Sequence, residues 1–215
     1  MRESGAEKQL VPNPQFAELA SEGRLERTIR ALESNNIRTF VAKNGREARL
    51  KVLELLPIGA EVFTATSKTT ESIGLAQEIN DSGHYVSLRS KIASLDRKTQ
   101  ANKIRLIAGA PDYVVGSIHA VTEHGQVLIA SASGSQLALY ASGAGTLIWV
   151  VGTQKIVSNV DEGFRRIEEY AFPMENARMM EAHKLQSAVN KVLIVNKEGK
   201  PGRTTLIFVK EKLGF

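Results

Sequence analysis

The chain has 215 residues, of which 42% are hydrophobic and 24% charged, and it carries a formal net charge of +5 at pH 7 with no cysteine. This length and composition suit one globular α/β domain with a terminal arm. The absence of cysteine excludes disulfides, a thiol nucleophile and any iron–sulfur cluster held by the chain's own side chains.

Apolar and charge patterning also bear on location and partners. The longest apolar stretch, residues 145–152, is far below the roughly 18 residues that span a bilayer, and residues 1–7 lack the apolar core of a signal peptide. We therefore expect a cytoplasmic protein with no membrane partner. Lys and Arg are scattered among 23 acidic residues, and few aromatic residues are available for base stacking, which argues against nucleic acid. A mildly basic surface suits a small anionic metabolite.

The first half of the chain predicts an arm followed by alternating strands and helices. Residues 1–22, with Pro12-Asn13-Pro14, are expected to be an N-terminal arm that frays rather than wraps another subunit, and residues 23–215 a single domain. Apolar periodicity and turn residues predict, in order, helix 23–35, strand 37–42, helix 46–56, strand 60–64, a helix capped by Thr66 or Ser67 and closed at 80–83, strand 84–88, helix 96–108 and strand 112–116. The nearly continuous apolar run of this last strand is typical of a central strand.

The second half contains two predicted hairpins. Residues 120–130 are predicted to reverse at His124-Gly125, and residues 192–196 to pair with residues 204–210 across a turn. Between the hairpins lie helix 135–141, strand 146–151 with the lone tryptophan, helix 159–170 and a helical stretch over 174–189. The element order therefore indicates an α/β fold with a mostly parallel mixed sheet plus β-hairpins.

Two polar loops each follow a strand and precede a helix. They contribute Ser67, Lys68, Thr70 and Glu71 from the first loop, and Gly134, Ser135 and Gln136 from the second. Free backbone N–H groups and the helix dipole favour an anion at such positions, although the same residues serve as ordinary helix caps. Because open α/β sheets bind ligands at the carboxyl ends of their strands, we expect the two loops to share a cleft.

Lys155 follows the strand of Trp149 after the turn residue Gly152. It is therefore expected near the same carboxyl ends of the strands. A lysine there neutralises an anionic ligand, whereas a lysine left in solvent has no such role. Of these two alternatives we favour anion binding.

Histidine and carboxylate side chains supply the candidates for proton transfer. His119 and His124 flank the 120–130 hairpin, and with Glu123 they suggest a metal, but alternating strand positions face opposite ways and no further ligand is clear, so no metal is predicted. His119 is a candidate general base or a hydrogen-bond donor to the ligand. The carboxylates placed for acid–base work are Glu71, Asp112, Glu123 and Asp161, and no spacing selects among them. The serines lack the Gly-x-Ser-x-Gly sequence of a hydrolase nucleophile.

Taken together, these segments resemble the LUD, or lactate-utilisation, domain family. The resemblance runs in order over roughly residues 25 to 215 and is carried by residues 66–75, 112–125, 133–136, 150–157 and 202–214. Matched position by position, the motif residues are Ser67, Thr70, Glu71, Gly74, Gly116, Ser117, His119, Ala120, Thr122, Glu123, Gly125, Gly134, Ser135, Gln136, Gly152, Lys155 and Arg203.

This resemblance implies a three-layer α/β/α fold similar to that of the ribose-phosphate isomerase, glucosamine-phosphate deaminase and CoA-transferase superfamily. It also implies a place in bacterial lactate oxidation to pyruvate, in which companion subunits carry iron–sulfur clusters. The cysteine-free composition fits the cluster-free subunit or a stand-alone LUD protein, with no cofactor bound by this chain alone.

The sequence thus favours a protein of organic-acid metabolism that binds a small anion between the loops of Ser67, Ser135 and Lys155, while His119 or Glu123 handles a proton. One alternative is a sugar-phosphate isomerase or acyl-CoA transferase, which rests on fold analogy. Another is a non-enzymatic assembly module that docks iron–sulfur subunits or further copies of itself through the arm and the C-terminal hairpin.

Overall fold

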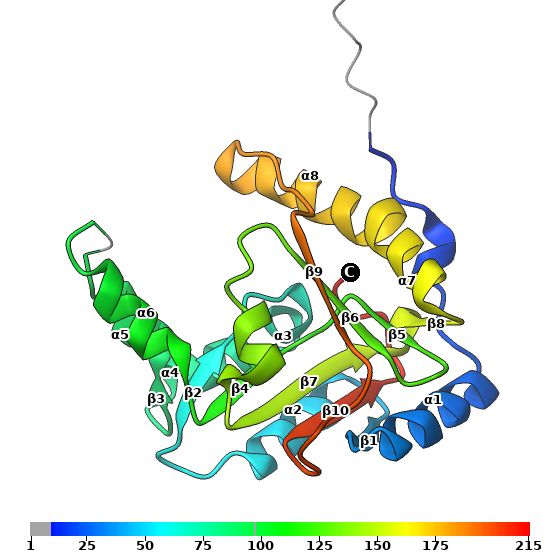
Figure 1. Cartoon of the computed structure of the whole chain (residues 1–215), viewed down its shortest axis with the longest axis horizontal. Helices are drawn as coiled ribbons and strands as arrows, with labels where there is room; N and C mark the ends of the chain where they lie inside the picture. The colour runs from blue at the N-terminus through cyan, green and yellow to red at the C-terminus, as the bar shows by residue number, and fades with distance from the viewer. Residues whose placement is uncertain (1–9, 97) are drawn as a thin grey trace, which may run out of the picture.

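The computed structural model of the chain describes residues 10–96 and 98–215 and contains two sheets with helices around them (Figure 1). The main sheet has the order β1-β10-β7-β4-β2-β3, and each of its neighbouring pairs is parallel. Its strands are β1 (Arg38–Ala42), β2 (Glu61–Thr64), β3 (Val86–Ser87), β4 (Tyr113–Gly116), β7 (Thr146–Gly152) and β10 (Thr204–Val209).

A smaller second sheet has the order β8-β5-β6-β9. Strand β6 pairs antiparallel with both β5 and β9, while β8 pairs parallel with β5. Its strands are β5 (Ala120–Thr122), β6 (Val127–Ser131), β8 (Ile156–Val157) and β9 (Lys191–Val195).

Helices connect the strands and cover the sheets. The α-helices are α1 (Glu22–Ser34), α2 (Gly45–Leu55), α3 (Lys68–Ser72), α4 (Leu75–Asp81), α5 (Leu88–Ala93), α6 (Ala101–Gly109), α7 (Val160–Arg166) and α8 (Phe172–His183). Short 3-10 turns form η1 (Pro14–Ala17) and η3 (Thr153–Lys155), and wider π-helical turns form η2 (Leu139–Gly143) and η4 (Ile167–Ala171). None of the helices formed by the described residues is long and apolar enough to cross a membrane.

Alternating side chains of the strands divide the interior into three apolar layers. In β7, Leu147 and Trp149 face a core shared with α1 and the second sheet, whereas Ile148 and Val150 face a core made with α2 and α4. The second sheet continues the pattern, because Leu128 points away from the main sheet toward the helical segment that contains Ile167. The order of layers is therefore α2 and α4, main sheet, α1 with the second sheet, and α7 with η4.

The fold class expected from the sequence, a three-layer α/β/α architecture with a mostly parallel sheet, is confirmed for the main sheet and the helices on its two faces. The second sheet and the helical segment that covers it add to the face on which α1 lies. The central position of β4 is also correct, since it pairs with β2 on one side and β7 on the other. The hairpin of residues 120–130 exists as β5 and β6. This hairpin belongs to the second sheet, however, and the neighbouring strands of the main sheet are all parallel.

The predicted C-terminal hairpin is wrong. β9 pairs with β6 in the second sheet, whereas β10 lies between β1 and β7 in the main sheet. Residues 204–209 are all buried, as expected for a strand covered on both faces, while β9 is an edge strand that is partly exposed. The turn of residues 197–202 therefore joins two sheets rather than two paired strands, a distinction that local patterning cannot make.

Fraying of the arm is also contradicted from Asn13 to Ala17, while residues 1–9 lie outside the described part of the chain. Phe16 is 6% exposed, and the Asn13 N–H donates to the carbonyl of Glu169 at 2.8 Å. That carbonyl is free because Pro173, four residues further on, has no N–H to donate to it. A proline in the helix thus provides the acceptor that holds the arm.

Some predicted elements are divided in the structure. The helix expected to follow Ser67 is broken into α3 and α4 at Gly74, whose φ of 68° lies in the left-handed region. The strand expected at residues 84–88 shortens to β3, and α5 begins at Leu88. The helices expected at 159–170 and 174–189 instead run together through η4, and α8 ends at His183.

Candidate functional site

A cavity of about 320 Å³ lies where β2, β4 and β7 end at one edge of the main sheet. Since these strands are parallel neighbours, the segments that follow them meet at this edge. The segment after β2 contributes Thr66 to Thr69, the segment after β4 contributes Ser117 to His119, and η3 contributes Lys155. The loop after β6, together with α8, completes the cavity wall.

Lys155 is the most deeply placed charged group of this cavity, with a residue exposure of 1%. Its Nζ lies 3.1 Å from the Thr69 hydroxyl, 3.1 Å from the Ser117 hydroxyl and 2.9 Å from the Ile118 carbonyl. Lys155 is therefore turned back into the protein by η3 instead of extending into solvent.

The directions of these hydrogen bonds define the state of the lysine. The Ser117 hydroxyl donates to the Val150 carbonyl at 2.7 Å, and the Thr69 hydroxyl donates to the Leu213 carbonyl at 3.2 Å. Both hydroxyls therefore accept from Lys155, as the Ile118 carbonyl must. An ammonium has one N–H for each of these three acceptors, so the arrangement suits the protonated amine.

This ammonium has neutral partners only. Burial, and then the nearby Arg166 guanidinium, lower the pKa of Lys155 well below its ordinary value. Among the described residues, none of its hydrogen-bond partners is a carboxylate. A buried charge without an opposite charge is unfavourable, so a negative charge placed beside Lys155 would lower the electrostatic free energy of the folded protein.

His119 lines the same cavity and is half-buried. Its Nδ1 accepts a hydrogen bond from the Ala130 N–H at 3.1 Å, so the neutral imidazole carries its proton on Nε2. Burial, together with the positive charges of Lys155 and Arg166, lowers the pKa of His119 to about 3. Near neutral pH the ring is therefore a hydrogen-bond donor through Nε2 and a poor proton acceptor. Of the two roles expected for His119, the geometry favours donation to a ligand.

The two polar loops meet at the cavity as the sequence suggested. Ser67 and Lys68 line it from one side, and Ser135 and Gln136 from the loop after β6. That loop is shaped by Gly134, whose φ of 85° is left-handed and whose N–H donates to the Ser131 hydroxyl at 2.9 Å. Lys68 forms an ion pair with Glu71 at 2.8 Å, so its charge is already compensated.

Gly116 and Gly152 are not among the residues that line the cavity, and each supports it through close packing. A Cβ on Gly116 would overlap the Tyr140 hydroxyl, which donates to the Ser117 carbonyl at 3.2 Å. A Cβ on Gly152 would lie 2.6 Å from the Glu211 carbonyl of the C-terminal segment. Each glycine thus lets a second segment approach a strand end.

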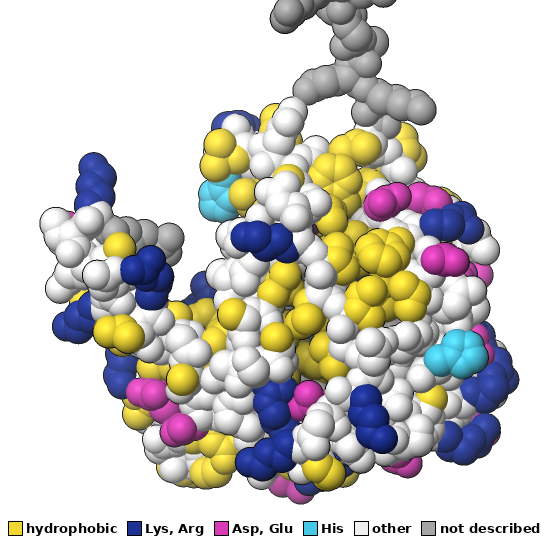
Figure 2. Space-filling view, viewed as in Figure 1, with side chains coloured by type: hydrophobic (Ala, Val, Ile, Leu, Met, Phe, Trp, Pro, Cys, Tyr) yellow, Lys and Arg dark blue, Asp and Glu magenta, His cyan; other side chains and the backbone are white. Residues whose placement is uncertain are grey.

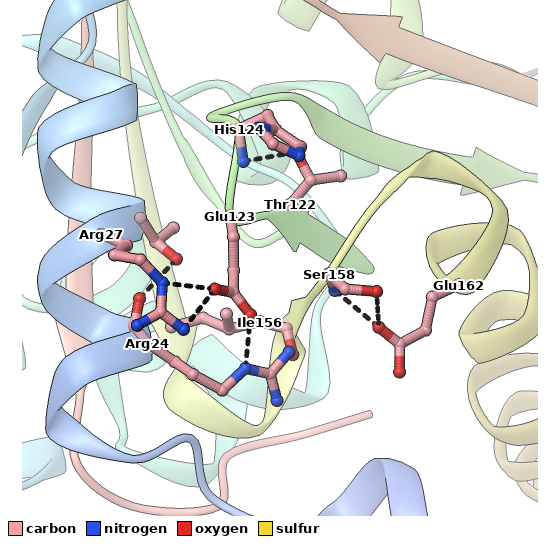
Figure 3. Close-up of polar contacts among 9 residues, drawn as sticks. Arg24, Arg27, Thr122, Glu123, His124, Ile156, Ser158 and Glu162 are labelled. Carbon is pink, nitrogen blue, oxygen red and sulfur yellow. Dashed lines mark hydrogen bonds and ion pairs between the residues drawn. The ribbon is translucent and has the colours of Figure 1, made fainter.

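Glu123 lies elsewhere. His119 precedes β5 and Glu123 follows it, so the two residues are separated by the length of that strand. As Figure 3 shows, the Glu123 carboxylate accepts from Arg24 Nε at 2.7 Å and Arg27 Nε at 2.8 Å, both on α1. These two arginines outweigh partial burial and lower the pKa of Glu123. Glu123 connects α1 to the second sheet, and the structure does not bring it to the cavity.

Other predicted residues also have local roles. The Thr70 hydroxyl donates to the Ser67 carbonyl, and Glu71 is an exposed partner of Lys68. The His124 N–H donates to the Thr122 hydroxyl in the turn of the hairpin (Figure 3). Within residues 10–96 and 98–215, no three His, Cys, Asp or Glu side chains gather as metal ligands would.

Several residues of the site were missed by sequence reasoning. The Thr69 hydroxyl accepts a hydrogen bond from Lys155. Arg166 is fully buried and donates to the His119 carbonyl. Glu175 and Arg178 bring an ion pair of 2.6 Å from α8. Phe215, which follows β10 in the sequence, contributes its aromatic ring to the cavity wall. The Thr-rich loop hinted at Thr69, but nothing local marks the others, because they reach the cavity through tertiary packing.

Comparisons with known proteins agree with this architecture. A family model described as the LUD domain matches residues 25–210. Among solved structures, the chain is similar to a DUF162 family protein from Deinococcus radiodurans, with a TM-score of 0.55 and 13% sequence identity, over 89% of this chain and 99% of that chain. At this identity the likeness shows the fold alone. No curated protein matches the chain.

Proposed function

Because the chain belongs to the LUD domain family, which is linked to lactate utilisation, we propose that it binds a small anionic metabolite of organic-acid metabolism in the cavity above Lys155. The observation that carries the proposal is the buried ammonium of Lys155, whose hydrogen-bond partners are all uncharged. A ligand carboxylate supplies the missing negative charge at short range in a site of low dielectric.

The remaining polar groups of the cavity suit a carboxylate with a neighbouring oxygen. Ser67 and Ser135 offer hydroxyls, and Gln136 offers an amide. The Nε2–H of His119 offers a donor that stays neutral at physiological pH. Neutral donors bind a carboxylate without adding to the buried positive charge of Lys155 and of the nearby Arg166. Because Lys155 is the buried cation that lines the cavity, we expect a ligand with one negative charge.

Within lactate-type metabolism, the expected contribution of this chain is to hold the organic acid while other subunits accept electrons. Oxidation of lactate to pyruvate releases an electron pair and two protons, and no cysteine is present here to ligate an iron–sulfur cluster. We therefore propose iron–sulfur subunits as partners and electron acceptors. Co-purification of the tagged chain with a cysteine-rich iron–sulfur protein from the source cells tests this; recovery of the chain alone under anaerobic conditions argues against it.

Ligand binding is tested with Lys155→Met, which keeps an apolar stem of similar length but removes the charge. We expect lactate or pyruvate to raise the melting temperature of the unaltered protein, because a ligand that binds only the folded state stabilises it. In Lys155→Met the affinity measured by calorimetry should fall by at least about tenfold, equivalent to about 1.4 kcal/mol.

A matched control is Lys103→Met, which removes the same charge from the exposed surface of α6. This variant should bind as the unaltered protein does, so that loss of net charge alone is excluded as the cause. Folded Lys155→Met protein with unchanged affinity would contradict the proposal. Failure of both lactate and pyruvate to bind the unaltered protein would contradict binding of these acids by this chain alone.

A further inference from the structure

We infer that the preferred ligand of this cavity is a monocarboxylate larger than lactate, with an apolar or aromatic side chain that lies against Phe172, Val189 and Phe215. This inference rests on the proposed function and adds the substrate class. Three observations support it: the volume of the cavity, the apolar groups on its wall and the number of charges left uncompensated.

The volume exceeds the need of lactate. The cavity measures about 320 Å³. At roughly 30 Å³ for each water-sized group, it has room for about ten such groups, whereas lactate provides about six. A ligand as small as lactate would leave water in much of this partly apolar cavity, so most of the apolar surface of the wall would stay in contact with water. The space therefore fits an acid with several further carbon atoms.

The apolar part of the wall comes from different elements than the hydroxyls do. The helical segment contributes Ile167 and Ala171 from η4 and Phe172 from α8. The segment after α8 contributes Val189, and the segment after β10 contributes Phe215. The hydroxyls instead come from loops at the carboxyl ends of strands. On the face viewed in Figure 2, hydrophobic side chains are also gathered in the region where α8 and the second sheet meet. The cavity thus has a polar floor and an apolar helical wall.

The apolar wall is not fully covered by the protein itself. Val189 is 37% exposed, and Phe172 and Phe215 are half-buried. Covering such surface with a hydrocarbon or aromatic group contributes roughly 25 cal/mol for each Å² removed from water. An aromatic ring is suited to this wall because it buries a large area with few rotatable bonds.

The charges of the site fit a single carboxylate. Lys68 is paired with Glu71, and Arg178 with Glu175, so these two cations of the cavity wall have their own carboxylates. Lys155 is left as a cation with uncharged partners. Arg166 is a second buried cation close to Lys155, and its hydrogen bonds go to backbone carbonyls, but it does not line the cavity. A sugar phosphate would therefore bring a second negative charge for which the described cavity lining offers no further cation without its own carboxylate. A monoanion with an apolar group satisfies both the floor and the wall.

The test is a calorimetric series with lactate, 2-hydroxyhexanoate and 3-phenyllactate, with uncharged 3-phenyllactamide as the probe for the role of the carboxylate. We expect 3-phenyllactate to bind at least about tenfold more tightly than lactate and its amide to bind much more weakly than the acid. In Phe172→Ala this preference should fall to about threefold or less, because binding of 3-phenyllactate weakens more than binding of lactate. Val189→Ser, at an exposed position, provides a second variant should Phe172→Ala fail to fold.

Leu106→Ala is the matched control, because Leu106 is an apolar side chain that is 80% exposed on α6 and does not line the cavity. It should retain the full preference for 3-phenyllactate. Equal affinity for lactate and 3-phenyllactate in the unaltered protein would overturn the inference while leaving the proposed function intact. Equal weakening of both acids by Phe172→Ala and by Val189→Ser would also overturn it. Binding that Lys155→Met does not alter would overturn the proposed function itself.

Discussion

His119 is neutral because of where its two nitrogens lie. Nδ1 accepts from the Ala130 N–H, and burial beside Lys155 and Arg166 lowers the ring's pKa to about 3. In an unfolded chain the same ring has a pKa of about 6.5. Between about pH 3 and pH 6.5, the His119 ring is therefore protonated in the unfolded chain and neutral in the folded protein.

This difference predicts a pH dependence of stability with a definite sign. Above about pH 6.5 the ring is neutral in both states and has no effect, and as the pH falls toward 3 the unfolded state gains the proton and becomes more favourable. At pH 5 the expected cost of folding from this ring is about 2 kcal/mol. Between pH 7 and pH 5, the free energy of unfolding measured with urea should fall by about 2 kcal/mol less in His119→Asn than in the unaltered protein.

Asparagine is chosen because its side-chain oxygen can take the place of Nδ1 as the acceptor for the Ala130 N–H. His84→Asn is the control, at an exposed histidine whose ring packs edge-on against Tyr85. It should lose as much stability between the two pH values as the unaltered protein. Equal pH dependence in His119→Asn would show that the ring is protonated in the folded state.

Glu123 illustrates the opposite outcome at the same scale. The family motif placed it among the functional residues, but its carboxylate is held by Arg24 and Arg27 of α1. A side chain in a family motif can therefore have a structural role, joining two elements, instead of a role in binding or catalysis. Only the position of its partners distinguishes the two.

At the scale of elements, the end of β7 and the C-terminal segment form one structural unit. Gln154 Nε2 donates to the Leu213 carbonyl at 2.9 Å, and the Thr69 hydroxyl donates to the same carbonyl at 3.2 Å. Gly152 makes this approach possible, because a Cβ there would lie 2.9 Å from the Leu213 N. The segment in turn brings Phe215 to the cavity.

Gly152→Ala should therefore destabilise the protein by about 3 kcal/mol, since the added methyl group meets backbone atoms that cannot rotate away. Thermal and urea unfolding measure this effect. The same variant should weaken binding of 3-phenyllactate more than binding of lactate, because displacement of the segment removes Phe215 from the wall. Gly199→Ala, where an added Cβ has no atom within 4 Å, should stay within about 0.5 kcal/mol of the unaltered protein. A similarly small effect of Gly152→Ala would contradict the close packing described here.

At the scale of the whole molecule, the two sheets share one apolar core. Val121 and Ile129 of the second sheet lie in the same buried cluster as Trp149 and Phe208 of the main sheet, with Leu32 of α1. Neither sheet can lose its partner without exposing this cluster to water. We therefore expect both sheets to unfold in a single cooperative transition.

Trp149, which is 1% exposed, reports on the main sheet by its fluorescence. A Phe164→Trp reporter in a Trp149→Phe background reports on the helix that covers the second sheet. The urea midpoints from both reporters should each agree with that from far-UV circular dichroism of the same variant. An earlier midpoint from the Phe164→Trp reporter than from circular dichroism would show that the second sheet unfolds separately.

The sequence by itself determined the class of the fold and the edge at which the site lies. Apolar runs, glycines and capping residues are local signals, and they were sufficient to place β2, β4 and β7 in a parallel sheet with polar loops at their ends. Because parallel strands end at the same edge, Ser67 and Lys155 could be expected near each other before any contact was known. The family resemblance extended this to the three-layer architecture.

Only the tertiary structure decided which strands pair and which side chains meet. β9 and β10 follow one another in sequence as two hairpin strands would, yet they belong to different sheets, because pairing depends on long-range burial and not on the turn between them. The charge environment of Lys155, the proton position on His119 and the apolar wall of Phe172 and Phe215 likewise arise from segments far apart in the chain. Burial and hydrogen-bond partners exist only once those segments are packed, which is why the sequence indicated a site while the structure gave its chemistry.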